Sequence, residues 1–185
     1  NGANGLKPTT ATAAFDAGNS SWGARLDGSP VVQFDGVARP YSAQKKNIEN
    51  FYRTGNTFTN TLSFGKAFEG GSVRFSVSNL TNQSVLPNSG LDRVNLNLST
   101  TFNVSKRFTI DARANFVSDK AKNRPILADG AGNANFQVMF LPTSLDINTL
   151  KPGYKANGDE LLFTNNTYAT NPWFVVNKFK NDLSR

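Results

Sequence analysis

The sequence predicts an all-β fold of long antiparallel strands, and three observations lead to that prediction. Apolar and polar residues alternate with period two along four successive segments in the middle of the chain. Each segment runs to about ten residues, whereas the strands of soluble proteins average about 5–6. The connections between the segments are alternately short and long.

The first part of the chain is expected to be a loop. Gly, Ala, Asn, Thr and Ser dominate residues 1–56, and Asp27-Gly28 and Asp35-Gly36 are dipeptides typical of turns. One short helical turn is expected at Asn47–Tyr52. After residue 56 the sequence changes to alternation, which is the pattern of a strand with one apolar and one polar face.

Four strands are expected in the alternating region. The first two are Thr57–Lys66 and Gly71–Leu80, and Asn60 interrupts the apolar stripe of the first. The alternation is clearest in the third and fourth strands, at Val94–Val104 and Phe108–Phe116. The apolar stripes contain Phe58, Leu62, Phe64, Val73, Phe75, Val77, Val94, Leu96, Leu98, Phe102, Val104, Phe108, Ile110, Ala112, Ala114 and Phe116.

The lengths and connections of these strands favour a membrane barrel. A tilted strand needs about 9–11 residues to cross a bilayer. Short turns are expected at Ala67–Gly70 and Ser105–Arg107, and a long connection is expected at Thr81–Arg93. Short periplasmic turns and long extracellular loops are typical of bacterial outer-membrane barrels, which turn apolar residues to lipid and polar residues to the lumen.

The sequence therefore predicts one sector of an antiparallel transmembrane β-barrel, of about four to five strands, in the outer membrane of a Gram-negative bacterium. Residues 57–118 are its four membrane strands, residues 1–56 and 119–171 are extracellular loops, and residues 172–185 start the next strand. Four strands cannot close, because the smallest such barrels need about eight. The chain is thus expected to be part of a longer protein.

Three charged residues, Arg74, Asp111 and Arg113, are expected on the polar face that lines the lumen. One interpretation is a network in the barrel wall that holds water or another part of the protein. The other interpretation is a polar track for the substrate. The sequence leaves both open.

The composition argues against an enzyme, a cofactor or a metal site. The chain contains no Cys and no His, so it lacks a thiolate nucleophile and the commonest general base. Asp129–Asn135 alternates oxygen-bearing side chains as a calcium loop does, but it lacks the bidentate Glu of such a loop. The net charge of +7 comes from dispersed Lys and Arg, so no nucleic-acid partner is expected.

Several short runs, in order along the chain, resemble one family of transporters. They are Trp22–Gly28, Gln33–Gly36, Arg39–Tyr41, Asn50–Asn60, Pro87–Ser89, Lys122–Pro125, Asn171–Trp173, Asn181-Asp182 and Ser184-Arg185. Together they resemble the SusC/RagA family of TonB-dependent outer-membrane transporters over nearly the whole chain. The resemblance implies a barrel of about 22 strands around a plug, with the plug and its TonB-contacting segment outside this chain.

The resemblance also implies active import of a nutrient, either an oligosaccharide or a peptide. It implies a SusD-like lipoprotein over the extracellular mouth and TonB acting through the missing plug segment, in a barrel surrounded by outer-membrane lipid. Aromatic residues of the loops are candidates to stack on a ligand, although such residues also pack loops. These candidates are Trp22, Phe34, Tyr41, Tyr154 and Trp173.

A secreted β-sandwich adhesin or glycan-binding module remains open as an alternative. Its strands would alternate in the same way, but its apolar residues would meet those of a second sheet in a dry core. A barrel enzyme is a further alternative, against which the absence of His counts. Solubility without detergent separates the sandwich from the barrel.

Overall fold

The computed structural model describes residues 5–17 and 21–185, and these residues form two compact units. The strand unit contains Thr54–Val85, Ser89–Arg124 and Asp182–Arg185. The loop unit contains Leu86–Asn88, Pro125–Asn181 and the described residues up to Arg53. Of the expected N-terminal loop, residues 1–4 and 18–20 lie outside the described residues. The described fold is mostly β, in antiparallel sheets, as the sequence predicts.

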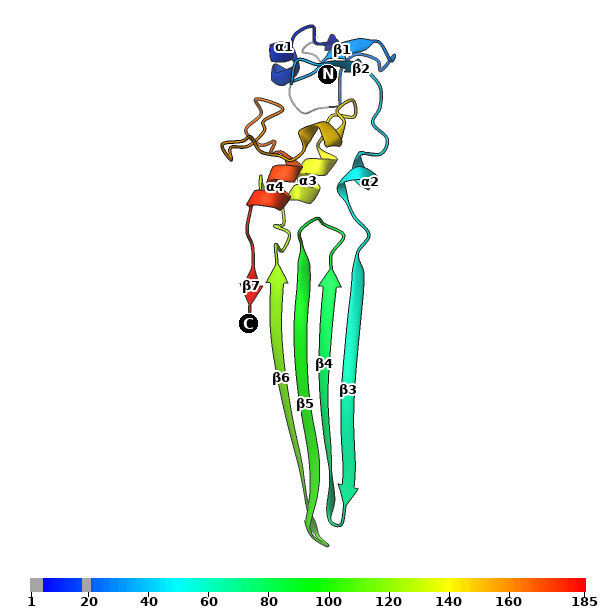
Figure 1. Ribbon diagram of the computed structural model, residues 1–185, viewed down its shortest axis with the longest axis vertical. Helices are drawn as coiled ribbons and strands as arrows, with labels where there is room; N and C mark the ends of the chain where they lie inside the picture. Colours follow the sequence, from blue (N-terminus) through cyan, green and yellow to red (C-terminus); the bar gives the residue numbers. More distant parts are fainter. Residues whose placement is uncertain (1–4, 18–20) are drawn as a thin grey trace. The chain divides into compact units, whose positions relative to one another are not determined.

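Four long antiparallel strands run side by side in the strand unit (Figure 1). They are β3 (Asn56–Phe68), β4 (Gly71–Gln83), β5 (Gly90–Ser105) and β6 (Phe108–Lys122). They contain 13, 13, 16 and 15 residues, so each extends beyond the segment that alternation marks. The pairing of β3 with β4 is continuous from Asn56 opposite Gln83 to Phe68 opposite Gly71.

The connections at the two ends of this sheet differ in length. Glu69 and Gly70 alone join β3 to β4, and Gly70 has a φ of 85°, which glycine adopts without steric cost. Lys106 and Arg107 join β5 to β6 at the same end. At the other end, the chain between β4 and β5 passes through Leu86–Asn88 of the loop unit.

The expected long connection Thr81–Arg93 was wrong, because residues 81–83 belong to β4 and residues 90–93 belong to β5. Thr81 lies opposite Asp92 in the ladder, and Asn82 lies opposite Leu91. Backbone hydrogen bonds join strands whatever the polarity of the side chains. Alternation of hydrophobicity therefore ends before the strands do.

A fifth strand, β7 (Leu183–Ser184), pairs with β6 through two positions, Lys120 with Ser184 and Ala121 with Leu183. The order in the sheet is β3-β4-β5-β6-β7, so within the described ranges β3 has a neighbour on one side only. The sheet of the strand unit is open in this part of the chain.

The loop unit contains short helices and a small hairpin (Figure 1). These are α1 (Ala11–Asp16), β1 (Pro30–Val32), β2 (Ala38–Pro40), α2 (Asn47–Phe51), α3 (Ala134–Met139), the 3-10 helix η2 (Ile147–Leu150) and α4 (Pro172–Lys178). The helical turn expected near Asn47 is confirmed as α2. The expectation of loops throughout residues 1–56 and 119–171 was wrong at α1, β1, β2, α3 and η2, and at residues 119–122, which belong to β6.

Capping explains why α1, α3 and η2 were missed. Thr10 accepts a hydrogen bond from the backbone N–H of Ala13 at 3.1 Å and so begins α1. Asn133 and Asp146 act in the same way at α3 and η2. Polar residues of this kind satisfy the first N–H groups of a helix, and the same residues also favour turns. The turn expected at Asp35-Gly36 is confirmed between β1 and β2, where Gly36 has a φ of 79°.

The loop unit has a core of its own. Phe51, Ile147 and Leu150 are at most 1% exposed. Leu86, from the connection between β4 and β5, and Val176 of α4 belong to the same cluster. These residues come from separate parts of the sequence, so the core depends on long-range contacts.

Asn171 ties together three segments of the loop unit. It is 0% exposed, and its side chain accepts a hydrogen bond from the backbone N–H of Trp173 at 3.0 Å. Its Nδ2 donates to the carbonyl oxygens of Leu150 and Leu161, each at 3.0 Å. With Pro172 at the first turn, this cap starts α4. Residues 172–185 were expected to start the next strand, and this was wrong up to Asp182, because the next strand in the sheet begins only at Leu183.

Asn171→Ala should destabilise the loop unit by about 2–4 kcal/mol, because it removes the cap of α4 and the amide that donates to the carbonyls of Leu150 and Leu161. The measurement is the free energy of unfolding from chemical denaturation. Asn157→Ala is the matched control, since Asn157 is exposed in a turn and should cost less than about 0.5 kcal/mol. Equal effects of the two substitutions would contradict the role given to Asn171.

Candidate functional site

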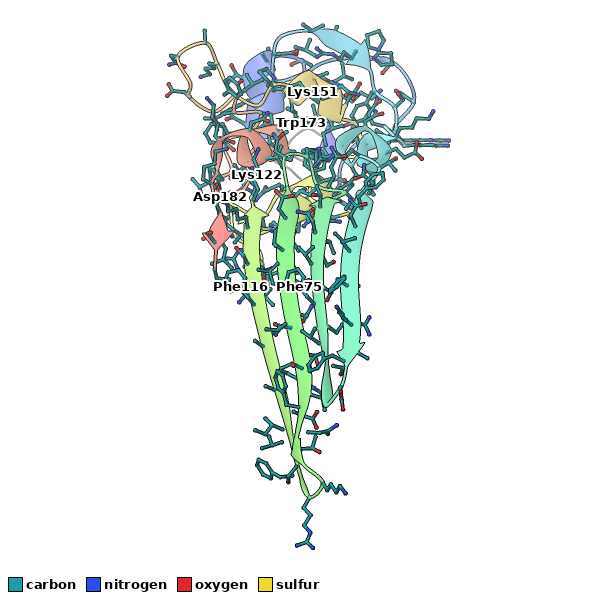
Figure 2. The ribbon with its side chains drawn as sticks, turned by 60° about the horizontal axis from the view of Figure 1, so that its bottom comes forward. Phe75, Phe116, Lys122, Lys151, Trp173 and Asp182 are labelled. Carbon is teal, nitrogen blue, oxygen red and sulfur yellow. The ribbon has the colours of Figure 1, made fainter. Side chains whose placement is uncertain are left out.

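The alternation of residues divides the sheet of the strand unit into an apolar face and a polar face. Residues that lie opposite one another in the ladder share a face. One row of the apolar face is Phe64, Phe75, Leu98 and Ala114, and the next row is Leu62, Val77, Leu96 and Phe116. Phe75 and Phe116 are labelled in Figure 2.

The apolar face is exposed over several rows of the sheet. Phe58, Leu62 and Phe64 of β3 are 69%, 73% and 62% exposed, and Phe116 of β6 is 58% exposed. Large side chains on so wide a surface mark an interaction with another apolar phase or surface, because isolated soluble domains rarely expose patches of this kind.

The apolar face changes to polar residues towards the end of the sheet that carries the longer connections. Asp92 of β5 lies opposite Thr81 of β4 and Lys120 of β6, and Lys122 ends the same face of β6. Lys122 and Asp182 are labelled in Figure 2. Asp182 accepts a hydrogen bond from the backbone N–H of Asn123 at 2.8 Å, which anchors the chain before β7. The apolar surface is therefore a band with a polar border.

The polar face brings together the three charged residues that the sequence predicted for it. Arg74, Ser99 and Arg113 lie opposite one another on β4, β5 and β6. Asp111 lies in the next row and accepts a hydrogen bond from the hydroxyl of Thr101 at 2.6 Å. Whether these residues form a wall network or a substrate track stays a prediction.

Small polar side chains surround this charged group. Thr61 donates to the hydroxyl of Ser78 at 3.0 Å, and Asn115 donates to the side-chain oxygen of Asn97. A hollow of about 420 Å³ is lined by Arg74, Asn97, Leu98, Ser99, Arg113, Ala114 and Asn115. The polar face thus offers hydrogen-bond donors, acceptors and cations over one continuous surface.

Sequence reasoning missed one ion pair on the same face. Arg93 lies opposite Asp119, and its Nε is 2.6 Å from Oδ1 of that carboxylate. Nε of Arg185 lies 3.6 Å from Oδ2 of Asp119. Both partners of the first pair lie beyond the clearest part of the alternation, and their opposite charges at facing positions were the signal that could have found them.

Two of the predicted ligand-binding aromatic residues, Phe34 and Tyr41, line a small pocket in the loop unit. Tyr41 is 3% exposed, and Phe34 packs against the core. The pocket has a volume of about 50 Å³. A dry cavity of about 150 Å³ is known to bind benzene, so this pocket is too small for an aromatic or sugar ring as it stands.

The other three predicted aromatic residues lie apart from that pocket. The centre of the Trp173 ring, on α4, lies 4.4 Å from Nζ of Lys151, and Nε1 of Trp173 donates to the carbonyl of Ile147 at 2.9 Å. Figure 2 labels Lys151 and Trp173. Nζ of Lys178 lies 4.0 Å from the centre of the Tyr154 ring. Trp22 is 85% exposed. The structure does not gather the five residues into one site, and a ligand role for them stays a prediction.

Glu160 is a half-buried carboxylate near one of these aromatic residues, Tyr154. It lies opposite Tyr154 in an isolated bridge, and its Oε1 accepts a hydrogen bond from the backbone N–H of Asn171 at 2.6 Å. Burial raises the pKa of Glu160 above its ordinary value, and the hydrogen bond opposes part of that rise.

In the segment that resembled a calcium loop, Asn133 forms hydrogen bonds with backbone groups. Asn133 caps α3 and donates from Nδ2 to the carbonyl of Ala128 at 2.6 Å. In residues 5–17 and 21–185, no three acidic side chains gather closely enough to hold a metal ion. No helix in those ranges is both long and apolar enough to span a membrane.

The sheet of the strand unit, with one apolar and one polar face, defines an amphipathic antiparallel β protein in the part of the chain that the structure describes. The model of one protein family, described as putative MetA-pathway of phenol degradation, matches residues 8–133. This match covers more than half of the chain, so the chain belongs to that family. Among curated proteins, none matches the chain.

The family assignment overturns the resemblance to the SusC/RagA family, which was wrong. The fold shows that some of the runs behind that resemblance have local roles. Asp35-Gly36 makes a hairpin turn, and Asn171-Pro172 begins α4. Turn and cap chemistry of this kind recurs in unrelated proteins, so such runs do not specify a family.

The raised pKa of Glu160 predicts that the loop unit loses stability as the pH rises from about 4.5, the ordinary value for Glu. In that range the folded state binds more protons than the unfolded state, so a rise in pH favours unfolding. Glu160→Gln keeps an acceptor oxygen and removes the charge. It should flatten the dependence of the melting temperature on pH above about 4.5.

Asp159→Asn is the control for that experiment, because Asp159 is the exposed neighbour of Glu160. A melting temperature that depends on pH equally in Glu160→Gln and in the wild type would show that Glu160 does not cause the effect.

Proposed function

We propose that this chain is a sector of a β-barrel in the outer membrane of a Gram-negative bacterium, and that the barrel imports a nutrient. The observation that carries the proposal is the exposed apolar band of the strand unit, which includes Phe58, Leu62, Phe64 and Phe116. Lipid is the environment in which such a band is stable without a covering sheet.

The strand lengths support the membrane location. Strands β3 to β6 contain 13 to 16 residues, and about 9–11 tilted residues cross a bilayer. The residues left over extend past the hydrocarbon region, which agrees with the polar border at Asp92, Lys120 and Lys122. One edge of β3 has no neighbour among the described residues, and this supports a longer barrel, because an unpaired edge in lipid leaves backbone groups without hydrogen bonds.

The polar face supports the passage of a solute. In a barrel it would line the lumen with Ser, Thr and Asn side chains and with Arg74, Asp111 and Arg113. The two-residue turns would be periplasmic, and the connections at the other end would be extracellular. The solutes to test are an oligosaccharide and a peptide. The description of the family adds phenol to this panel, because it refers to a phenol-degradation pathway.

Two further parts of the proposal concern partners. Energy from TonB and a SusD-like lipoprotein over the extracellular mouth were expected from the resemblance that the family assignment overturned. They remain predictions, and each has its own test. Loss of TonB should abolish concentrative uptake, and loss of the lipoprotein should lower apparent affinity for the solute.

Leu96→Arg should destabilise the membrane-embedded protein by about 2–4 kcal/mol, because the side chain would meet lipid near the middle of the band. Asn97→Arg is the matched control on the next residue of β5, whose side chain lies on the polar face. It should cost much less. The measurement is the fraction of folded, heat-resistant protein in the outer membrane fraction of cells.

Equal tolerance of Leu96→Arg and Asn97→Arg would contradict a lipid-facing band. A protein that stays monomeric without detergent, with a second sheet over the apolar face, would instead support the β-sandwich alternative.

Deletion of the gene for the full protein should remove uptake of one solute in the panel and leave the others unchanged. The measurement is accumulation of labelled oligosaccharide, peptide or phenol in cells, with and without a functional TonB. Passive equilibration of the solute in both strains would contradict energised import, and unchanged uptake after the deletion would contradict import by this protein.

A further inference from the structure

We infer that Arg74 and Arg113 form a binding subsite for an acidic group of the solute, such as a carboxylate, a phosphate or a sulfate. The inference rests on the proposed barrel, in which the polar face lines the lumen. It gives one function to two residues whose role the sequence left open, and it adds a charge requirement to the solute.

The register places the two arginines on either side of one small residue. Arg74 of β4 and Arg113 of β6 both lie opposite Ser99 of β5. Neighbouring strands are about 4.8 Å apart, so the two backbones are about 10 Å apart. Both side chains are exposed and both line the hollow of about 420 Å³. An oxyanion between them can accept hydrogen bonds from both guanidinium groups.

Neither arginine has a counterion within the part of the chain that the structure describes. The carboxylate nearest in register, Asp111, accepts a hydrogen bond from Thr101 and forms no ion pair with Arg113. Arg93, on the same face, does have a counterion, because Oδ1 of Asp119 lies 2.6 Å from its Nε. The sheet therefore satisfies one arginine of the polar face internally and leaves two for another partner.

The neighbours leave room for such a partner. Gly65 lies opposite Arg74 on β3, and a Cβ atom at this position would meet only the carbonyl of Val73, at 3.8 Å. Ser99 is small, and its hydroxyl adds one more donor between the guanidinium groups. Two like charges at this spacing repel each other in a narrow lumen, so an anion between them is favoured over an empty site.

The geometry suits a planar or tetrahedral oxyanion rather than a neutral sugar. Arginine presents parallel N–H donors that match the two oxygens of a carboxylate, phosphate or sulfate. A neutral hydroxyl would leave both charges without compensation. We therefore expect acidic solutes to bind more tightly than neutral solutes of the same size.

The test is binding of radiolabelled sulfate to the purified full-length protein in detergent, measured by equilibrium dialysis. Arg74→Gln and Arg113→Gln should each weaken binding by about tenfold or more, because each removes charge-assisted hydrogen bonds. Arg107→Gln is the matched control, since Arg107 lies in the two-residue turn between β5 and β6. It should leave sulfate binding unchanged.

Arg74→Lys and Arg113→Lys keep the charge and remove the paired donors, so they should bind sulfate with an affinity between those of the wild type and the Gln variants. They keep the subsite testable if the Gln variants fail to fold. Absence of sulfate binding by the wild type would overturn the subsite. So would equal affinity of the wild type and the Lys or Gln variants. Sulfate would also fail to bind to the wild type if a carboxylate from another part of the protein occupied the space between the two arginines. In that case the Gln variants would lose thermal stability.

The failure of this inference is distinguishable from failure of the barrel. Tolerance of Leu96→Arg would remove the barrel, whatever the sulfate result. Loss of assembly in Leu96→Arg, together with sulfate binding that does not depend on Arg74 or Arg113, would remove the subsite alone.

Discussion

The backbone ladder from β3 to β6 is the constraint on which the strand unit depends. Successive side chains of a strand point to opposite faces, so a shift of one residue in any pairing would move the whole apolar set of one strand to the polar side. Phe75 lies opposite Phe64 and Leu98, and its neighbour Arg74 lies opposite Ser99. The separation of the apolar face from the polar face thus depends on the register of the strands, which short turns such as Glu69-Gly70 help to fix.

The strands were predictable because the alternation of apolar and polar residues is a local property, which can be recognised in the sequence without knowledge of tertiary contacts. Their ends were not, because Thr81 and Asp92 pair through backbone groups that carry no hydrophobic signal. Helix α4 was missed although Asn171-Pro172 is a good helix start, since its core contacts come from distant segments. In the candidate site, the alternation of residues was enough to place the charged residues on the polar face. The ion pair of Arg93 with Asp119 could be recognised only from the pairing of β5 with β6.

The two units use the same residue types for different purposes. In the loop unit, Asn171 satisfies buried backbone groups, and Trp173 hydrogen-bonds to the carbonyl of Ile147. In the strand unit, Asn97 and Asn115 bond to each other across an exposed face. Aromatic and amide side chains of this chain therefore do not by themselves indicate a ligand. What distinguishes a residue such as Arg74 is an exposed charge that its own unit leaves without a counterion.

Leu86 has a consequence for the order in which the chain assembles. It enters the core of the loop unit from the six-residue connection between β4 and β5, and that core also draws on Phe51 and Val176. Most of that core comes from residues 134–176, after the four long strands, so Phe51 and Leu86 join it only by closing large loops, which slows folding. A delay in the pairing of β4 with β5 would thus keep Leu86 out of this core until late in folding, and apolar residues left exposed in this way favour aggregation.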